Sequence, residues 1–259
     1  MKLAVSGKGG VGKTTLSAML CGVLALQGRR VVAVDADPDA NLASALGISP
    51  DERITPLAEM EDLIAERTGS ADQYGGYFRL NPRVDDIPEK YARRIGNIRL
   101  LVLGGVSKGG SGCICPATAL LKALLIHLSL ADDEHLIMDM EAGIEHLGRA
   151  TAQSMDALIV VVEESPWSTQ TAQRVRKLAL DIGMTRIFAV ANRVDQAAKL
   201  EKIGEQLGEV PLIGHLPTDA RLVEGIVTTA PDGRLMPSQA LADHQPAVER
   251  ILAELKKRT

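Results

Sequence analysis

The segment GKGGVGKTT, residues 7–15, constrains the fold of this chain more than any other feature. It follows a short apolar run at residues 2–6 and precedes an apolar segment of helical length at residues 16–27. Its spacing G-x-x-x-x-G-K-[ST] is typical of a phosphate-binding loop, in which glycines let backbone N–H groups turn toward phosphate oxygens at the start of a helix. A strand, such a loop and a helix in this order predict the first unit of an α/β nucleotide-binding fold.

Each position of this loop has an expected role. We expect the Lys13 ammonium to reach the β- and γ-phosphates and the Thr14 hydroxyl to ligate Mg²⁺. The other loop residues expected to contact the nucleotide are Gly9, Gly10, Val11, Gly12 and Thr15. A glycine-rich turn that arises by chance is the alternative, and four fixed positions in a strand-to-helix setting argue against it.

Apolar runs alternate with segments of helical pattern along the rest of the chain. Continuous Val, Ile and Leu runs such as RRVVAVD, IRLLVLGG and DALIVVVEE are typical of parallel strands that are covered on both faces. About seven such strands can be counted, and helix-like segments lie between them at residues 115–130, 168–182, 196–207 and 239–257. This alternation predicts a doubly wound, mostly parallel α/β sheet of about seven strands.

The chain shows no repeat, low-complexity tract or linker that would divide it, so we expect one domain at residues 1–259. Residues 69–96 interrupt the alternation, since they hold all three tyrosines and two prolines without clear periodicity. We interpret this segment as a surface insertion, which is either a plain long connection or a docking site for a partner.

The composition argues against several classes of function. Aromatic residues make up 2% of the chain, so stacking platforms for nucleic-acid bases are not expected. A net charge of −4 gives no general attraction to phosphate polymers, and we predict no nucleic-acid partner. Residues 246–259 are amphipathic with a moderate apolar face, which favours packing on the same domain over stable membrane association. The chain starts without a targeting pattern, so we expect a cytoplasmic protein.

Carboxylates follow two of the predicted strands, at the end where α/β sheets bind ligands. Asp35, Asp37 and Asp39 lie in VDADPDAN, and Asp139 ends the strand in HLIMDMEAG. We expect Asp139 to hold Mg²⁺ through water and the Gly143 N–H to lie near the γ-phosphate. Short acids also suit turns and helix caps, and this alternative fits Asp39 better than Asp37.

Three ordered motifs, KGGVGKTT, DADPDANL and DMEAGIE, resemble those of the deviant Walker ATPases, the family of MinD, ParA and the nitrogenase iron protein. In that family the early lysine, here Lys8, reaches across a nucleotide-sandwich dimer to the partner's phosphates, where a cation stabilises phosphoryl charge. The resemblance also implies that Asp37 orients the attacking water and that Asp139 begins the second switch segment. The positions that match the family's adenine contacts are Asn192, Pro217 and Asp219.

Cys113 and Cys115 form a C-x-C pair between a predicted strand and a predicted helix. In a reducing compartment, cysteines are metal ligands, redox thiols or nucleophiles more often than structural disulfides. Two thiolates fill half of the four-ligand sphere of tetrahedral Zn²⁺ or square-planar Ni²⁺, so a two-fold dimer would complete an S₄ site. A redox pair and coincidental small residues at a helix start are the alternatives. The third cysteine, Cys21, lies in the apolar helix after the loop and is expected in the core.

The stretches GCICPATALLKALL and DMEAGIEHLGRAT closely resemble the CooC-type ATPases, a subgroup of nickel-handling accessory proteins that mature carbon monoxide dehydrogenase. This resemblance implies an ATP-dependent metallochaperone that forms a homodimer with ATP and holds Ni²⁺ or Zn²⁺ on the C-x-C cysteines of both subunits. Its expected client is carbon monoxide dehydrogenase or acetyl-CoA synthase. The alternatives are a MinD/ParA-like positioning or partitioning ATPase and a reductase of the iron-protein type, whose cluster cysteines are spaced far apart.

Overall fold

The structure, a computed structural model, describes residues 1–69, 78–105, 116–130, 134–144 and 147–258. Its centre is an eight-stranded sheet in the order β3-β4-β2-β5-β1-β6-β7-β8, in which only β3 and β4 pair antiparallel. The strands are β1 (Lys2–Gly7), β2 (Val31–Asp35), β3 (Arg93–Ile95), β4 (Ile98–Val102), β5 (His135–Asp139), β6 (Ala157–Val162), β7 (Ile187–Asn192) and β8 (Leu212–Leu216). The predicted doubly wound, mostly parallel architecture is confirmed, with one strand more than the seven expected.

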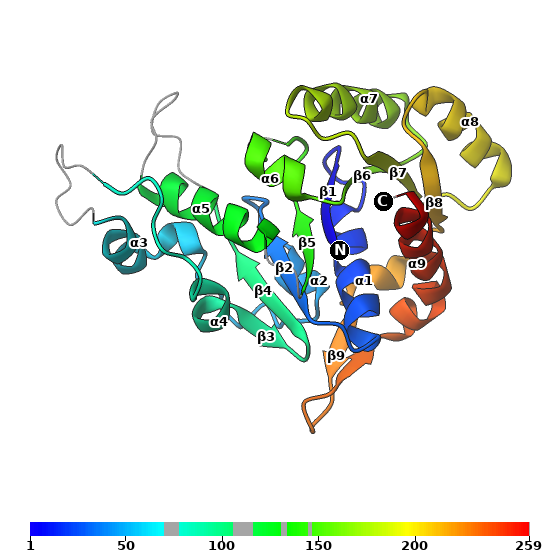
Figure 1. The fold of residues 1–259 in the computed structure, drawn as a ribbon. Helices are drawn as coiled ribbons and strands as arrows, with labels where there is room; N and C mark the ends of the chain where they lie inside the picture. The colour runs from blue at the N-terminus through cyan, green and yellow to red at the C-terminus, as the bar shows by residue number, and fades with distance from the viewer. Residues whose placement is uncertain (70–77, 106–115, 131–133, 145–146, 259) are drawn as a thin grey trace.

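Helices cover both faces of this sheet (Figure 1). The helices of the first face are α1 (Lys13–Leu26), α2 (Leu42–Ala45) and α9 (Gln239–Arg258). Those of the second face are α3 (Glu61–Thr68), α4 (Ile87–Tyr91), α5 (Pro116–Leu130), α6 (Arg149–Ser154), α7 (Pro166–Asp181) and α8 (Ala197–Leu207). Side chains along each strand alternate between the two cores, so Leu3 and Val5 of β1 join the first core and Ala4 joins the second. Because both faces are covered, the central parallel strands β1, β2, β5, β6 and β7 are largely apolar.

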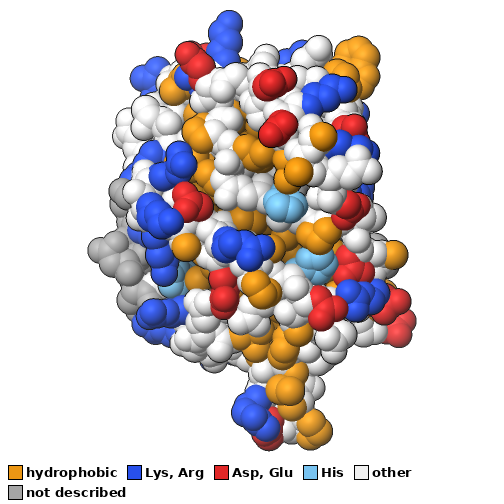
Figure 2. All heavy atoms as spheres, turned by 90° about the vertical axis from the view of Figure 1, so that its right-hand side faces the viewer, with side chains coloured by type: hydrophobic (Ala, Val, Ile, Leu, Met, Phe, Trp, Pro, Cys, Tyr) orange, Lys and Arg blue, Asp and Glu red, His pale blue; other side chains and the backbone are white. Residues whose placement is uncertain are grey.

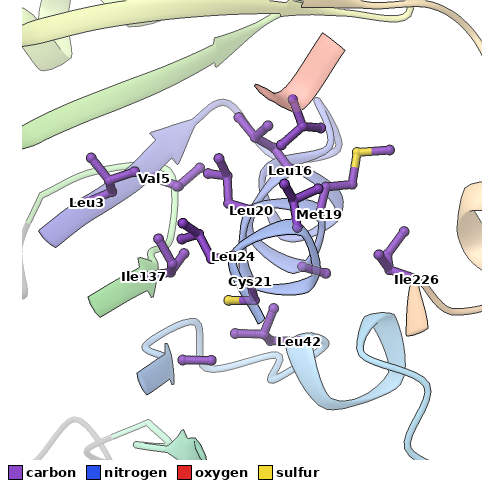
Figure 3. Close-up of a cluster of buried hydrophobic side chains, with 14 of the residues drawn as sticks. Leu3, Val5, Leu16, Met19, Leu20, Cys21, Leu24, Leu42, Ile137 and Ile226 are labelled. Carbon is purple, nitrogen blue, oxygen red and sulfur yellow. The ribbon is translucent and has the colours of Figure 1, made fainter. Parts of the chain in front are cut away.

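The first core packs around α1, the helix that follows the glycine loop (Figure 3). Leu20 lies on the side of α1 that faces β1, and Met19 lies on the opposite side. Cys21 is fully buried near Leu42, and burial raises the pKa of its thiol well above the usual range. The prediction that Cys21 is a core residue is therefore confirmed, and its thiol is not poised to react.

The described part of the predicted insertion, residues 78–96, packs against the second core and pairs with the sheet. Val84 and Ile87 are buried in the second core, and β3 pairs with β4 through Ile95 and Ile98. This part of the segment therefore contributes side chains to the core and a strand to the sheet edge, while others of its residues, such as Leu80 and Arg93, are exposed. The sequence RRI of β3 has no apolar run that would indicate a strand, because the strand is a short edge strand with two exposed arginines. The three tyrosines include two that lie outside the described residues.

A β-hairpin of β9 (Val227–Thr229) and β10 (Leu235–Pro237) precedes α9 and forms the projection at the lower end of Figures 1 and 2. The chain just before it is tied to α2, since the Ile226 N–H donates to the Ala45 carbonyl at 2.8 Å. Gly47 has φ +80°, and a Cβ there would lie 2.1 Å from the Val227 carbonyl oxygen. This close approach of two backbones requires glycine at position 47.

The C-terminal helix α9 packs along α1 and β8 with one apolar stripe. Leu241, Val248, Ile251 and Leu255 of this stripe are fully buried, as expected for a helix that covers its own domain. On the side of the molecule shown in Figure 2, several Lys and Arg side chains gather along the left edge, and elsewhere they lie among Asp and Glu. Within the described ranges, no helix is both long enough and apolar enough to cross a bilayer.

Candidate nucleotide site

The glycine loop and the predicted carboxylates Asp35 and Asp139 meet at the edge of the sheet where β1, β2 and β5 end. Asp35 is the last residue of β2 and pairs in register with Asp139, the last residue of β5. Val5 of β1 pairs with Asp139 on its other side, and the glycine loop begins two residues later at Gly7. Because these strands are parallel, their carboxyl ends converge on the point at which an α/β sheet binds ligands.

The glycine loop has the backbone that a phosphate cradle requires. Gly10 and Gly12 have φ values of +80° and +95°, which residues with a side chain rarely adopt. No side chain caps the first turn of α1, so the N–H groups that open the helix at Lys13 are available to an anion. A Cβ at Gly12 would lie 2.1 Å from Nδ2 of Asn192, which leaves room for glycine alone.

The two lysines of the loop lie in different surroundings. Lys13 is the first residue of α1 and is 7% exposed, and its charge acts on the Asp139 carboxylate. Lys8 lies at the front of the loop and is half-buried. Among the described residues no ion pair holds the Lys8 ammonium.

Asp139 is a buried carboxylate that is incompletely satisfied. Ser17 Oγ donates to its Oδ1 at 3.0 Å, while its Oδ2 is buried and has no hydrogen-bond partner within the described part of the chain. Burial raises the pKa of Asp139 to about 6, against the opposing effects of the Thr14 and Ser17 hydroxyls and of the Lys13 charge. An unpartnered buried carboxylate oxygen suits a hard cation with oxygen ligands, and Mg²⁺ held by Thr14 and Asp139 stays a prediction.

Asp35 and Asp37 shape the turn that follows β2. The Asp35 carboxylate accepts from the Asp37 N–H at 3.2 Å and from the Leu42 N–H at 2.8 Å. Burial raises the pKa of Asp35 to about 7, and the Leu42 N–H is the main opposing effect. Asp37 is half-buried and accepts from the Asp39 N–H at 3.1 Å, so the short acids also perform the turn role that the sequence left open. Asp35 thus fixes the start of α2 to the sheet edge.

Three side chains of the site were not indicated by the motifs. Ser6 Oγ lies 2.9 Å from the Gly143 carbonyl, so the residue before the loop holds the segment after β5. Ser17 lies one helical turn after Lys13 and contacts Asp139. Arg193 donates through Nη1 to the Gly10 carbonyl at 3.1 Å. Ser17 could have been predicted from its i+4 spacing from Lys13 on the same helix. Ser6 and Arg193 could not, because they reach the site through contacts between segments that are distant in the sequence.

The residues expected at the adenine lie at the carboxyl ends of β7 and β8. Asn192 is buried and its Nδ2 donates to the Val11 carbonyl at 2.8 Å, so it supports the loop. Pro217 and Asp219 follow β8 on the same edge. The Asp219 carboxylate caps η2 (Ala220–Val223) and is engaged by Arg221 and by His244 of α9. These contacts of the Asp219 side chain therefore also hold the nearby Pro217 and its backbone in place.

Cys113 and Cys115 lie outside the described residues. The elements on either side of them are described, since β4 ends at Val102 and α5 begins at Pro116, immediately after the second cysteine. Within the part of the chain that the structure describes, no group of three or more His, Cys, Asp or Glu residues is arranged to hold a metal ion.

The parallel sheet, the glycine loop and the carboxylates at the strand ends together define a P-loop ATPase of the MinD/ParA type. Residues 2–230 match the CobQ/CobB/MinD/ParA nucleotide binding domain, and the chain belongs to this family. It is 45% identical over 225 residues to the carbon monoxide dehydrogenase accessory protein CooC of Rhodospirillum rubrum, covering 86% of this chain and 85% of that protein. It is 43% identical to an uncharacterized ATP-binding protein of Methanocaldococcus jannaschii, over 86% of this chain and 88% of that protein.

Solved structures agree on the fold. A ParA family ATPase from Chlorobium tepidum superposes with a TM-score of 0.66 and 19% identity, over 98% of this chain and 97% of that one. The MinD cell division protein of Aquifex aeolicus gives a TM-score of 0.63 and 21% identity, over 99% and 95% of the two chains. At these identities the likeness concerns the fold alone.

Proposed function

We propose that this protein is an ATP-driven nickel metallochaperone of the cytoplasm that serves carbon monoxide dehydrogenase or acetyl-CoA synthase. The observation that carries the proposal is a C-x-C pair, Cys113 and Cys115, between the two switch segments of an ATPase. The 45% identity to a carbon monoxide dehydrogenase accessory protein supports the same client. The proposed reaction is hydrolysis of ATP to ADP and phosphate.

Each side chain of the site has a separate role in the proposed hydrolysis. Lys13, at the start of α1, neutralises charge on the β- and γ-phosphates, and Asp37 orients the attacking water. Thr14 and Asp139 would hold Mg²⁺, which when bound neutralises charge on the phosphate oxygens. The Lys8 ammonium, which no ion pair holds among the described residues, serves the γ-phosphate of a second subunit, as an arginine finger does.

The same dimer would complete the metal site. Lys8 follows β1 and the C-x-C pair follows β4, and both strands are parallel members of one sheet. The chain leaves both strands at the same edge of the sheet, and in the proposed dimer two subunits meet at this edge and bring Lys8 and the C-x-C pair into one interface. Four thiolates then bind the cargo ion, Ni²⁺ in a square-planar arrangement or Zn²⁺ in a tetrahedral one.

The proposal is tested by the nickel content of the full-length protein after equilibrium dialysis with Ni²⁺ and ATP. We expect one Ni²⁺ per two chains, and loss of this ion when Cys113→Ser and Cys115→Ser are combined. Cys21→Ala is the matched control, because this cysteine is sealed in the core and should not affect nickel binding. Nickel binding that is undiminished in the double variant would contradict the metallochaperone function and leave the ATPase in place.

A further inference from the structure

Strand β8 is the outermost strand at one end of the sheet. Within the described part of the chain it pairs with β7 alone, and this pairing is regular from Gly214 to Leu216. An outermost strand presents N–H and C=O groups that no neighbour uses, and these can pair with a further strand. Folded proteins commonly block such edges with charged residues or proline, and β3, at the other end, carries two exposed arginines. The sequence of β8, LIGHL, contains no Asp, Glu, Lys, Arg or Pro.

Two cavities adjoin along β8. The first has a volume of about 350 Å³ and lies between β8 and α9, where its lining includes Ile213 and Arg250. The second has a volume of about 240 Å³ and lies at the start of β7 and β8, where its lining includes Leu180, Phe188 and Pro211. Pro211 directly precedes β8, so the second cavity continues the first along the strand. We call the two cavities together the β8 groove.

The β8 groove is basic, although the chain as a whole carries a net charge of −4. Its ionised lining side chains are Arg176, Arg186, Arg250, Lys257 and Arg258, against Glu209 and Glu254. Both acids pair with basic residues of the groove, so positive charge remains in excess, and among the described residues no ion pair holds Arg250. Figure 2 shows the molecule from this end of the sheet, with hydrophobic side chains between charged ones.

An open strand edge beside a basic groove suits one class of partner. The edge recognises an extended chain through main-chain hydrogen bonds, and the basic side chains select acidic residues in that chain. We propose that β8 is a docking site for an extended acidic segment of another protein, which adds to the sheet as a ninth strand. A leucine at the second cavity, Leu180, is 40% exposed and offers a contact to an apolar side chain of the segment.

Two further observations separate this surface from the interfaces already described. A second copy of this chain suits the β8 groove less well, because two-fold pairing of β8 with itself would bring two basic grooves together. Two strands lie between β8 and β1, the strand that leads into the glycine loop. Docking at β8 is therefore independent of the proposed metal binding, and it can be measured without nucleotide.

Fluorescence anisotropy of a labelled octapeptide in which Glu and Val alternate tests the charge and the strand pairing separately. The peptide should bind the unaltered full-length protein, and Arg250→Glu combined with Lys257→Glu should weaken binding at least about tenfold. A peptide with Lys in place of Glu should bind at least about tenfold more weakly, because the groove repels it. The Glu-Val peptide N-methylated throughout should lose affinity to a similar extent, because it can donate no main-chain hydrogen bond.

The matched control is Arg53→Glu combined with Lys122→Glu, which reverses two exposed charges outside the groove. It should leave peptide affinity within about twofold, because distant surface charges are screened at physiological salt. The midpoint of urea denaturation should be the same for both double variants and the unaltered protein, which shows that the fold is intact.

Hydrogen exchange then locates the bound peptide. The peptide should slow amide exchange in β8, while exchange in β3, the other outermost strand, should stay unchanged. Equal affinity of Arg250→Glu with Lys257→Glu, or unchanged exchange in β8, would overturn the docking site. Failure of the Glu-Val peptide to bind the unaltered protein would overturn it as well, including where phosphatidylglycerol vesicles or single-stranded RNA bind in its place.

Discussion

Asp35 and Asp139 lie side by side on neighbouring strands, and burial raises the pKa of both carboxyls, to about 7 and about 6. These groups therefore hold their protons more tightly in the folded protein than in the unfolded chain. The contribution of these two carboxyls to the free energy of unfolding is fully present below about pH 4. It is lost as the pH rises through about 6 to 7, where the carboxyls ionise in the folded protein. The nucleotide-free protein thus carries an electrostatic cost at its site, which a bound cation would relieve.

Replacing Asp139 with Asn should remove part of this cost. At about pH 8 and without nucleotide, Asp139→Asn should raise the free energy of unfolding by about 2 kcal/mol and flatten its fall between about pH 5 and pH 8. Urea denaturation at the two pH values measures the effect, with Asp51→Asn as an exposed control. The same variant should lose Mg²⁺-dependent nucleotide affinity. Equal or lower stability at the higher pH would refute the account of this carboxylate.

In the proposed function, the role of Lys8 depends on a second subunit. Lys8→Ala should keep nucleotide affinity, because Lys13 and the loop backbone remain, but should lower ATP turnover about a thousandfold through loss of the cation supplied in trans. Steady-state phosphate release and calorimetry with ADP separate the two effects. Lys199→Ala is the control, since this lysine pairs with Glu164 on the surface. Undiminished turnover in Lys8→Ala would exclude the proposed role.

At the scale of elements, the glycine loop depends on β7 as well as on its own strand and helix. Asn192 bonds the Val11 carbonyl from the end of β7, and the Gly12 backbone packs against the same side chain. The loop is thus held between β1 and a strand two positions away in the sheet. This arrangement fixes the phosphate cradle before nucleotide binds, which lowers the entropy that binding must overcome.

Asn192→Ala should test this support. The change leaves the buried Val11 carbonyl without its donor and should lower the free energy of unfolding by about 1–3 kcal/mol. It should also weaken ADP binding, because the loop loses its anchor. Urea denaturation and calorimetry measure both, with Asn97→Ala in the exposed turn between β3 and β4 as control. A variant with unchanged stability and affinity would show that the anchor has no energetic role.

The elements that sequence patterns predict are those whose signal is local. The apolar runs of the parallel strands and the loop before α1 follow from burial on both faces and from fixed glycine spacing. Strand β3 and the β9–β10 hairpin have three-residue strands that are stabilised by pairing and docking, so their sequences carry little signal. The contacts of Arg193 and Asp195 with distant residues were likewise unpredictable, since they depend on how β7 and β8 end beside the loop.

At the scale of the whole molecule, the strands that precede Lys8 and the C-x-C pair, β1 and β4, end at the same edge of the sheet. Lys8 and the C-x-C pair come from different strands, and a single two-fold contact would recruit both. Nucleotide binding and metal binding would then be coupled through dimerisation, because ATP favours the dimer and the dimer completes the S₄ site. Such coupling requires ATP and metal to affect each other's affinity reciprocally.

The most direct test is to measure bound nickel and molar mass together, by light scattering with metal analysis of the eluted protein, in ATP and in ADP. The unaltered protein should form a dimer with one Ni²⁺ per two chains in ATP, and its nickel content should differ in ADP. Lys8→Ala should show the same mass and nickel content in both nucleotides. Nickel binding by the unaltered protein that is independent of nucleotide and of dimerisation would contradict the central claim.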